Sequence, residues 1–173
     1  MTSYHRPCLL DPDLHDRAGF VCREPAYAQW LHRYAGQNRR GNTAATWVIT
    51  DAAQRVVAYA TLSMTGIDLS AAPPAMRKAA PDPVPALLIG RLAVDERHEG
   101  LGLGTELVKH ILATAVELNE SAAFKAVVVT ALDHHARTWW RDRLGFTPFD
   151  PDADDNFDLY LLTSSIVATM DRL

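Results

Sequence analysis

The sequence has little cysteine, no long apolar run and no excess of positive charge. Its 2 cysteines in 173 residues are too few for a disulfide scaffold, and Cys8 and Cys22 form no ligand cluster. We therefore expect a reduced, cytoplasmic setting and no metal site. No apolar run approaches the ~20 residues needed to span a bilayer, and the N-terminus lacks the apolar core of a signal peptide. No membrane partner is expected.

The net charge of -4 separates the chain from general nucleic-acid binders, which are usually basic. This balance leaves room for a local basic patch. Hydrophobic residues make up 48% and charged residues 22%, which are ordinary values for a globular protein. A length of 173 residues suits a chain with one sizeable core. We therefore predict a single domain over residues 1–173.

The most informative stretch is residues 86–107, ALLIGRLAVDERHEGLGLGTEL. Its apolar first part, residues 86–94, predicts a buried strand, and a polar turn follows at residues 95–99. Gly100, Gly102 and Gly104 then alternate with leucines and lead into a helical pattern. Backbone N–H groups without side chains in the way can close on phosphate oxygens, and the helix dipole favours negative charge. The stretch predicts an anion-binding turn; the alternative is a tight turn that packs the helix closely.

Residue periodicity predicts an α/β fold, a mixed central sheet flanked by helices, around this stretch. Two runs rich in β-branched residues, 43–50 and 55–69, predict an antiparallel hairpin with a bulge near Gly66. A helix at residues 103–119 followed by an apolar strand at 125–131 predicts a parallel βαβ unit. Further elements are expected as a helix from Glu24 with Gly36 as its stop, a basic loop at 38–42, a short helix at 74–79, a helix at 134–143 capped by Asp133 and ended by Gly145, strands at 146–149 and 157–162, and a helix at 164–173.

Several motifs together resemble the GNAT family of acetyl-CoA-dependent N-acetyltransferases. The family's phosphate loop, Gln/Arg-x-x-Gly-x-Gly/Ala, fits best as Glu99-x-x-Gly102-x-Gly104, and an overlapping register begins at Arg97. The chain further resembles the toxin branch of the family, whose members pair with ribbon-helix-helix antitoxins. The pieces that carry this resemblance are FVCxEP at 20–25, Trp30-Leu31, AxLS at 60–63, PDPVP at 81–85 and GRLAVD at 90–95.

The resemblance implies a V-shaped splay in the sheet that holds acetyl-CoA, whose acetyl group passes to a primary amine. In the toxin branch the acceptor is the α-amine of an aminoacyl-tRNA, and relatives are often homodimers. The glycine turn would contact the diphosphate through its N–H groups, with the Glu99 side chain turned away. The predicted cofactor-binding residues are Leu92, Ala93 and Val94 on the strand, Glu99, Gly100, Leu101, Gly102, Leu103, Gly104 and Thr105 at the turn, and Thr130 on the next strand.

Acetyl transfer needs a neutral amine, a stabilised oxyanion and a leaving thiolate. An α-amine with a pKa near ~8 is partly neutral at pH 7, unlike a lysine near ~10.4, so the demand for a base is small. The family places Phe-Tyr shortly before Gly-Phe, and that Tyr protonates the thiolate. Here Trp139-Trp140 stands instead, one residue further from Gly145, and an indole cannot supply this proton. Trp140 is predicted at the catalytic site, with Tyr160, His134 or His135 as substitute acids.

Four cationic residues, Arg39, Arg77, Lys78 and Arg91, are predicted to bind substrate as a patch for tRNA phosphates. Ordinary solvated charge is the alternative for them. Two other functions stay open: acetylation of a small-molecule or protein amine, and a CoA-binding or antitoxin-binding protein with little turnover. The missing tyrosine favours the last of these.

Overall fold

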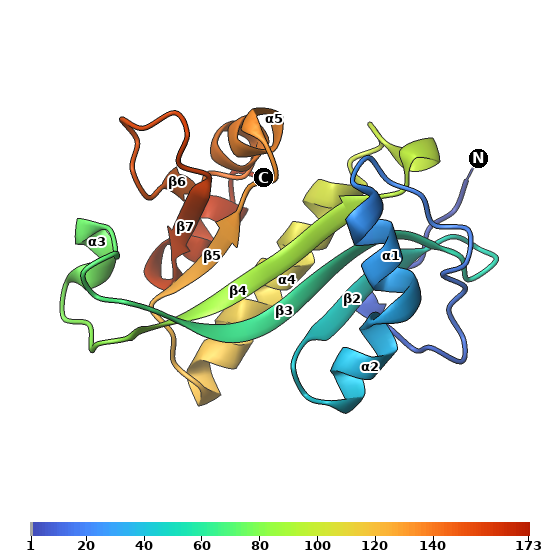
Figure 1. Cartoon of the computed structure of the whole chain (residues 1–173), viewed down its shortest axis with the longest axis horizontal. Helices are drawn as coiled ribbons and strands as arrows, with labels where there is room; N and C mark the ends of the chain where they lie inside the picture. Colours follow the sequence, from blue (N-terminus) through green and yellow to red (C-terminus); the bar gives the residue numbers. More distant parts are fainter. Residues whose placement is uncertain (1) are drawn as a thin grey trace. The chain divides into compact units, whose positions relative to one another are not determined.

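The computed structural model describes residues 2–173 and contains a seven-stranded mixed sheet (Figure 1). The strands are β1 (Cys8–Leu9), β2 (Ala45–Thr50), β3 (Val56–Ile67), β4 (Val84–Val94), β5 (Ala126–Thr130), β6 (Thr147–Pro148) and β7 (Asp158–Leu162). Their order across the sheet is β1-β2-β3-β4-β5-β7-β6. β4 and β5 are parallel, whereas the pairs β1–β2, β2–β3, β5–β7 and β6–β7 are antiparallel. The predicted mixed sheet is confirmed.

Helices and helical turns connect these strands. They are α1 (Pro25–Arg33), α2 (Ala35–Arg40), α3 (Pro74–Arg77), the 3-10 turn η1 (Glu96–His98), α4 (Leu103–Ser121), α5 (His134–Thr138), the π-helical turn η2 (Trp139–Arg143), the 3-10 turn η3 (Thr163–Ser165) and α6 (Ile166–Met170). Across residues 2–173, none of the helices has the length and apolar character that crossing a membrane requires.

The chain divides into two compact units. Unit 1 holds the residues up to Ser63 together with Gly90–His110, and unit 2 holds Met64–Ile89 and Ile111–Leu173. The assignment of residues 1–173 to one domain stays a prediction.

Unit 1 is built on the hairpin of β2 and β3, which α1 covers (Figure 1). The Glu24 side chain accepts the N–H of Ala26 at 3.1 Å and so caps α1 at its first turn. Trp30 of α1 is buried against Tyr59 of β3 in the core of this unit. The irregularity of the hairpin register lies between Ile49 and Thr50. Gly66 lies beyond the residues of β3 that pair with β2, so the bulge near Gly66 stays a prediction.

Gly66 permits a close approach of another residue, whereas Gly36 lies inside a helix that it was predicted to end. A Cβ atom on Gly66 would lie 3.0 Å from Pro83, which gives a packing reason for a glycine at this position. Gly36 does not stop a helix, since α2 runs through it and includes residues 38–40 of the basic loop predicted at 38–42. Gly36 is buried, and its Cβ position lies 3.7 Å from Pro12. This is an ordinary contact distance, so packing does not require a glycine there. The predicted helix stop at Gly36 is wrong.

Unit 2 contains the parallel ladder that the sequence predicts. Residues 86–89 of β4 pair in register with residues 126–129 of β5, and β4 continues to Val94. β7 then pairs with β5 along its whole length. Met76 of α3 is fully buried against this sheet together with Val84 and Val128. The sequence-predicted βαβ unit is confirmed by the parallel pairing and by α4.

Candidate active site

Gly100 and Gly102 shape the turn that leads into α4. Their φ angles are 75° and 79°, which is the left-handed conformation that glycine adopts without steric cost. A Cβ atom at either position would meet no heavy atom of the described residues within 4 Å. The space beside both glycines is therefore open, which does not fit a turn that merely packs a helix. It fits a backbone that a ligand approaches.

The beginning of α4 supplies donors at the same place. The carbonyl of Gly102 accepts the N–H of Glu106 at 3.0 Å, so the helical hydrogen bonds begin there. The N–H groups of Leu103, Gly104 and Thr105 precede this first bond and have no acceptor within the helix. Together with the dipole of a helix that extends to Ser121, they favour an anion.

Asp95 fixes the entry to this turn. Its carboxylate is fully buried and accepts the Val21 N–H at 3.1 Å and the Arg97 guanidinium at 2.7 and 2.8 Å. Burial on its own raises the pKa of Asp95. Hydrogen bonds from Arg97, Val21 and His98 outweigh burial and hold this pKa well below its usual range. A charged Asp95 therefore joins the end of β4 to the segment before α1.

Glu99, the residue that departs from the family's motif, is paired with Arg23. The Arg23 Nε lies 3.3 Å from Oε1 of Glu99, and Nη2 lies 3.3 Å from Oε2. A lone carboxylate next to an anion site opposes binding through its charge. Arg23 compensates this charge and holds the side chain. Sequence reasoning missed Arg23, because a contact between residues so far apart in the chain leaves no local pattern.

The end of β4 carries Leu92, Ala93 and Val94 and, just before them, Arg91. The guanidinium carbon of Arg91 lies 4.6 Å from the centroid of the Trp30 ring, a cation–π contact. Trp30 in turn stacks on Tyr59 at 5.9 Å and 9°. The Arg91 guanidinium therefore lies over a ring that is itself held by packing on Tyr59. Arg91 forms no hydrogen bond or ion pair with residues 2–173, so its N–H donors are available.

In unit 2, Thr130 and Tyr160 lie on neighbouring strands. The Thr130 hydroxyl donates to Asp158 at 2.7 Å, opposite it in the β5–β7 ladder. Tyr160 pairs with Val128, two residues before Thr130, so its side chain is on the same face as that of Asp158. The ring of Tyr160 packs edge to face on Phe149 at 5.6 Å. Its position is therefore constrained by packing.

Trp140 lies in the core of unit 2. It is 5% exposed and packs edge to face on Phe146 at 4.9 Å and on Trp139 at 5.1 Å. His135 occupies the first turn of α5, where it is exposed to solvent. Asp133 caps that helix by accepting the Ala136 N–H at 2.8 Å, as predicted. Of these predicted catalytic residues, Trp140 has the surroundings of a packing residue.

The other predicted substrate residues are divided between the units. Arg39, in the last turn of α2 in unit 1, donates to the carbonyl of Leu10 at 3.4 Å. Arg77 ends α3 in unit 2, and the carbonyl of Lys78 accepts the Lys125 ammonium at 2.7 Å. Arg39 in unit 1 and the pair Arg77 and Lys78 in unit 2 are therefore two separate basic groups in the sequence. Arg39 and Lys78 are exposed to solvent.

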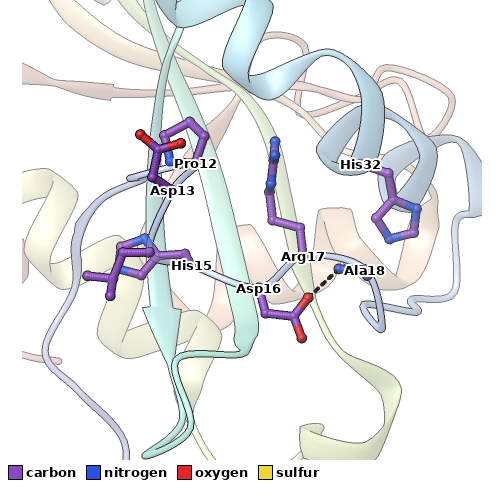
Figure 2. A pocket seen from close by; sticks show the side chains of 8 residues that line it. Pro12, Asp13, His15, Asp16, Arg17, Ala18 and His32 are labelled. Atoms are coloured by element: carbon purple, nitrogen blue, oxygen red, sulfur yellow. Dashed lines mark hydrogen bonds between the residues drawn. The ribbon is translucent and has the colours of Figure 1, made fainter.

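A separate depression of about 490 Å³ lies in unit 1 between residues 12–18 and His32 (Figure 2). Arg17 extends through it and donates to the carbonyl of Leu31 at 3.4 Å. Asp16 faces the opposite way and accepts the Ala18 N–H at 2.9 Å. The predicted cofactor residues are not among those that line this depression.

The model of the acetyltransferase (GNAT) family matches residues 12–146. The chain belongs to this family. The resemblance seen in the motifs is thereby confirmed, as is the assignment to acetyltransferase enzymes. A relative described as a tRNA-acetylating toxin from Mycobacterium tuberculosis (strain ATCC 25618 / H37Rv) is 31% identical over 141 residues, which are 81% of this chain and 83% of the relative. This relative lies in the toxin branch of the GNAT family.

Solved structures of toxins have the same fold as this GNAT protein. The toxin AtaT complexed with acetyl-methionyl-tRNAfMet matches with a TM-score of 0.84 and 23% identity, covering 96% of this chain and 98% of that one. AtaT bound to the C-terminus of the antitoxin AtaR and acetyl-CoA matches with a TM-score of 0.78 and 24% identity, covering 96% and 97%. A structure described as a bacterial toxin matches with a TM-score of 0.88 and 16% identity, covering 100% and 98%.

Proposed function

We propose that this chain transfers the acetyl group of acetyl-CoA to the α-amino group of an aminoacyl-tRNA and thereby blocks translation. The observation that carries the proposal is the open turn at Gly100 and Gly102, which leads into the N-terminus of α4. Its N–H groups suit the diphosphate of acetyl-CoA. Membership of the acetyltransferase (GNAT) family and 31% identity to a tRNA-acetylating toxin support the cofactor and the acceptor.

At the turn, we assign the diphosphate to the backbone of Gly100, Leu101, Gly102, Leu103, Gly104 and Thr105. Leu101 is 59% exposed between the two glycines, so its backbone is accessible. The backbone of Leu92, Ala93 and Val94 is assigned to the pantetheine arm and the thioester carbonyl, by the hydrogen bonding of an added strand. The end of the β4–β5 ladder at residue 89, five residues before β4 ends, supports this assignment. Thr130, on β5, is also assigned to the cofactor.

The chemical step is a direct attack by the amine. The lone pair of the neutral α-amine forms a bond to the thioester carbonyl carbon, and the carbon–sulfur bond then breaks. The proton lost by the amine nitrogen ends on the CoA sulfur, so the products are an amide and free CoA. An α-amine is partly neutral near pH 8, which makes a strong protein base unnecessary. Backbone N–H groups at the end of β4 stabilise the oxyanion.

We assign delivery of the proton to Tyr160 rather than to His135 or Trp140. A tyrosine O–H is a donor, and packing against Phe149 limits the positions of this ring. His135 is exposed on α5 without such packing. The Trp140 indole is not an acid, and its burial against Phe146 suits a residue that shapes the site.

For the acceptor, Arg91 is the residue we place nearest the chemistry, because it precedes Leu92 on β4 and keeps its N–H donors available. Its guanidinium suits a phosphate oxygen of the tRNA. Arg39, Arg77 and Lys78 are assigned to phosphates further along the tRNA. Since the net charge is -4, these contacts are local and strongly dependent on salt.

The resemblance to the toxin branch also suggests a cytoplasmic protein that forms a homodimer and is bound by a ribbon-helix-helix antitoxin. AtaT, to which the fold is similar, is described in complex with the C-terminus of its antitoxin. Light scattering of the purified protein tests the dimer by its mass.

The deciding experiment incubates the protein with radiolabelled acetyl-CoA and a mixture of charged tRNAs. We expect label on the aminoacyl group, and an acetyl-CoA-dependent loss of synthesis in a cell-free translation reaction. Label that appears instead on free small amines or on protein lysines would show a different acceptor. CoA binding without any labelled product would show a binding protein with little turnover.

A further inference from the structure

Residues 19–23, which precede α1, are joined at several points to residues 95–99, which precede the glycine turn. The contacts are Arg97 Nη2 to the Gly19 carbonyl at 2.7 Å, the Val21 N–H to Asp95 Oδ2 at 3.1 Å, the Glu96 N–H to the Val21 carbonyl at 2.9 Å, and the ion pair of Arg23 with Glu99 at 3.3 Å. The contacts hold the main chain at Gly19 and Val21, and Val21 lies two residues before Arg23.

The last of these contacts is the ion pair of Arg23 with Glu99. Glu99 carries the negative charge nearest in sequence to the glycine turn. Glu99 directly precedes Gly100, where the left-handed backbone begins. The two contacts of 3.3 Å engage both carboxylate oxygens with two guanidinium nitrogens. The side chains are 69% exposed for Arg23 and 37% for Glu99, so the pair is at the surface and adds little to the stability of the fold. Its effect is on the local charge.

We propose that Arg23 sets the affinity of the glycine turn for acetyl-CoA by neutralising Glu99 and fixing its carboxylate. The proposal rests on the acetyl-CoA site given above. Without Arg23, the Glu99 carboxylate is uncompensated next to the diphosphate and repels it. Arg23 is thus a positioning residue that acts through Glu99, and a site with an uncharged residue at position 99 would not need it.

The test is a double-mutant cycle on the full chain, with acetyl-CoA binding measured by isothermal titration calorimetry. We expect Arg23→Gln to raise the Kd by about five- to tenfold. Glu99→Gln alone is expected to lower the Kd, because it leaves the Arg23 charge uncompensated beside the diphosphate. The double variant is expected to bind within about twofold of the wild type, because both charges are gone. Arg23→Lys keeps the charge and is expected to bind nearly as well as the wild type.

Kinetic measurements separate this role from a structural one. Arg23→Gln is expected to raise the KM for acetyl-CoA with kcat unchanged, and the effect is expected to shrink as salt screens the carboxylate. Arg33→Gln, which removes the same charge from the last turn of α1, is the matched control and is expected to change neither constant.

Each contrary result has a distinct meaning. If the wild-type protein does not bind acetyl-CoA, the proposed function is wrong. If the wild type binds and Arg23→Gln binds equally well, only the role of Arg23 is wrong. A double variant as weak as Arg23→Gln would also overturn the proposal, because it would show that Arg23 acts on the cofactor or the backbone and not through Glu99.

Discussion

The backbone N–H of Phe146 donates to the carbonyl of Trp140, six positions earlier, at 3.0 Å. At a glycine-ended α-helix the corresponding bond spans five positions. The difference arises because η2 is a π-helical turn, which accommodates one extra residue. The spacing between Trp140 and Gly145 is one residue longer than the family's pattern. The π-helical turn η2 accommodates this extra residue. Insertions of this kind often occur at functional sites.

Trp140→Tyr is expected to lower the free energy of unfolding and to leave the rate of acetyl transfer within about threefold of the wild type. The smaller ring leaves space beside Phe146, at a cost of about 1–3 kcal/mol. Denaturant unfolding and CoA release measure the two effects. Trp139→Tyr, at a half-buried neighbour, is the control for the ring change and is expected to cost less stability. A large gain in rate for Trp140→Tyr would instead show that the native site lacks an acid.

Gly102→Ala is expected to abolish most acetyl-CoA binding with a loss of only about 1 kcal/mol in stability, the cost of a left-handed alanine. Its methyl group would point into open space in the protein and would meet only a ligand. Gly145→Ala is the matched control, since its φ of 76° carries the same cost. There the new Cβ meets Thr169 at 3.2 Å, so stability falls while acetyl-CoA binding persists. Calorimetry and thermal unfolding of both variants check this; equal cofactor affinity in the two would contradict it.

Acid is expected to weaken the fold through Asp95. The folded pKa of this carboxyl is below its unfolded value, so its contribution is fully present above the unfolded pKa near ~3.9. The contribution is lost as the pH falls from there toward the folded pKa. Asp95→Asn is expected to lower the free energy of unfolding at pH 7 by about 2 kcal/mol and to flatten its pH dependence below about pH 4. Urea unfolding at a series of pH values measures both; an unchanged slope in the variant would contradict the assignment.

Tyr160→Phe is expected to reduce kcat for acetyl transfer by about tenfold or more, because it removes the donor while it keeps the ring against Phe149. His135→Gln is expected to leave kcat unchanged, since His135 is exposed on α5. Steady-state release of CoA measures kcat for both variants. A loss of kcat in His135→Gln, with kcat unchanged in Tyr160→Phe, would instead identify His135 as the residue that protonates the CoA sulfur.

Local signals in the sequence were sufficient for most elements of this fold. The alternation and β-branched content of residues 43–50 and 55–69 predicted the hairpin, and Asp133 and Gly145 predicted the two ends of the helical segment between them. Such signals work because caps, turns and strand patterns depend on neighbouring residues. Gly36 was misread as a helix stop, because the burial that favours α2 at this position comes from contacts made in the folded protein. The close approach of Pro83 to Gly66 likewise joins residues that are distant in the sequence.

The sequence by itself determined the family and the glycine turn, because both depend on residues that lie next to one another between positions 86 and 107. Only the tertiary structure revealed that Glu99 forms an ion pair with Arg23, that Asp95 joins two segments, and that Trp140 is buried. These features depend on contacts between parts of the chain that folding brings together. The strength of a charge interaction or a packing contact depends on the distance between the two groups in the folded protein. A local pattern of residues does not specify that distance.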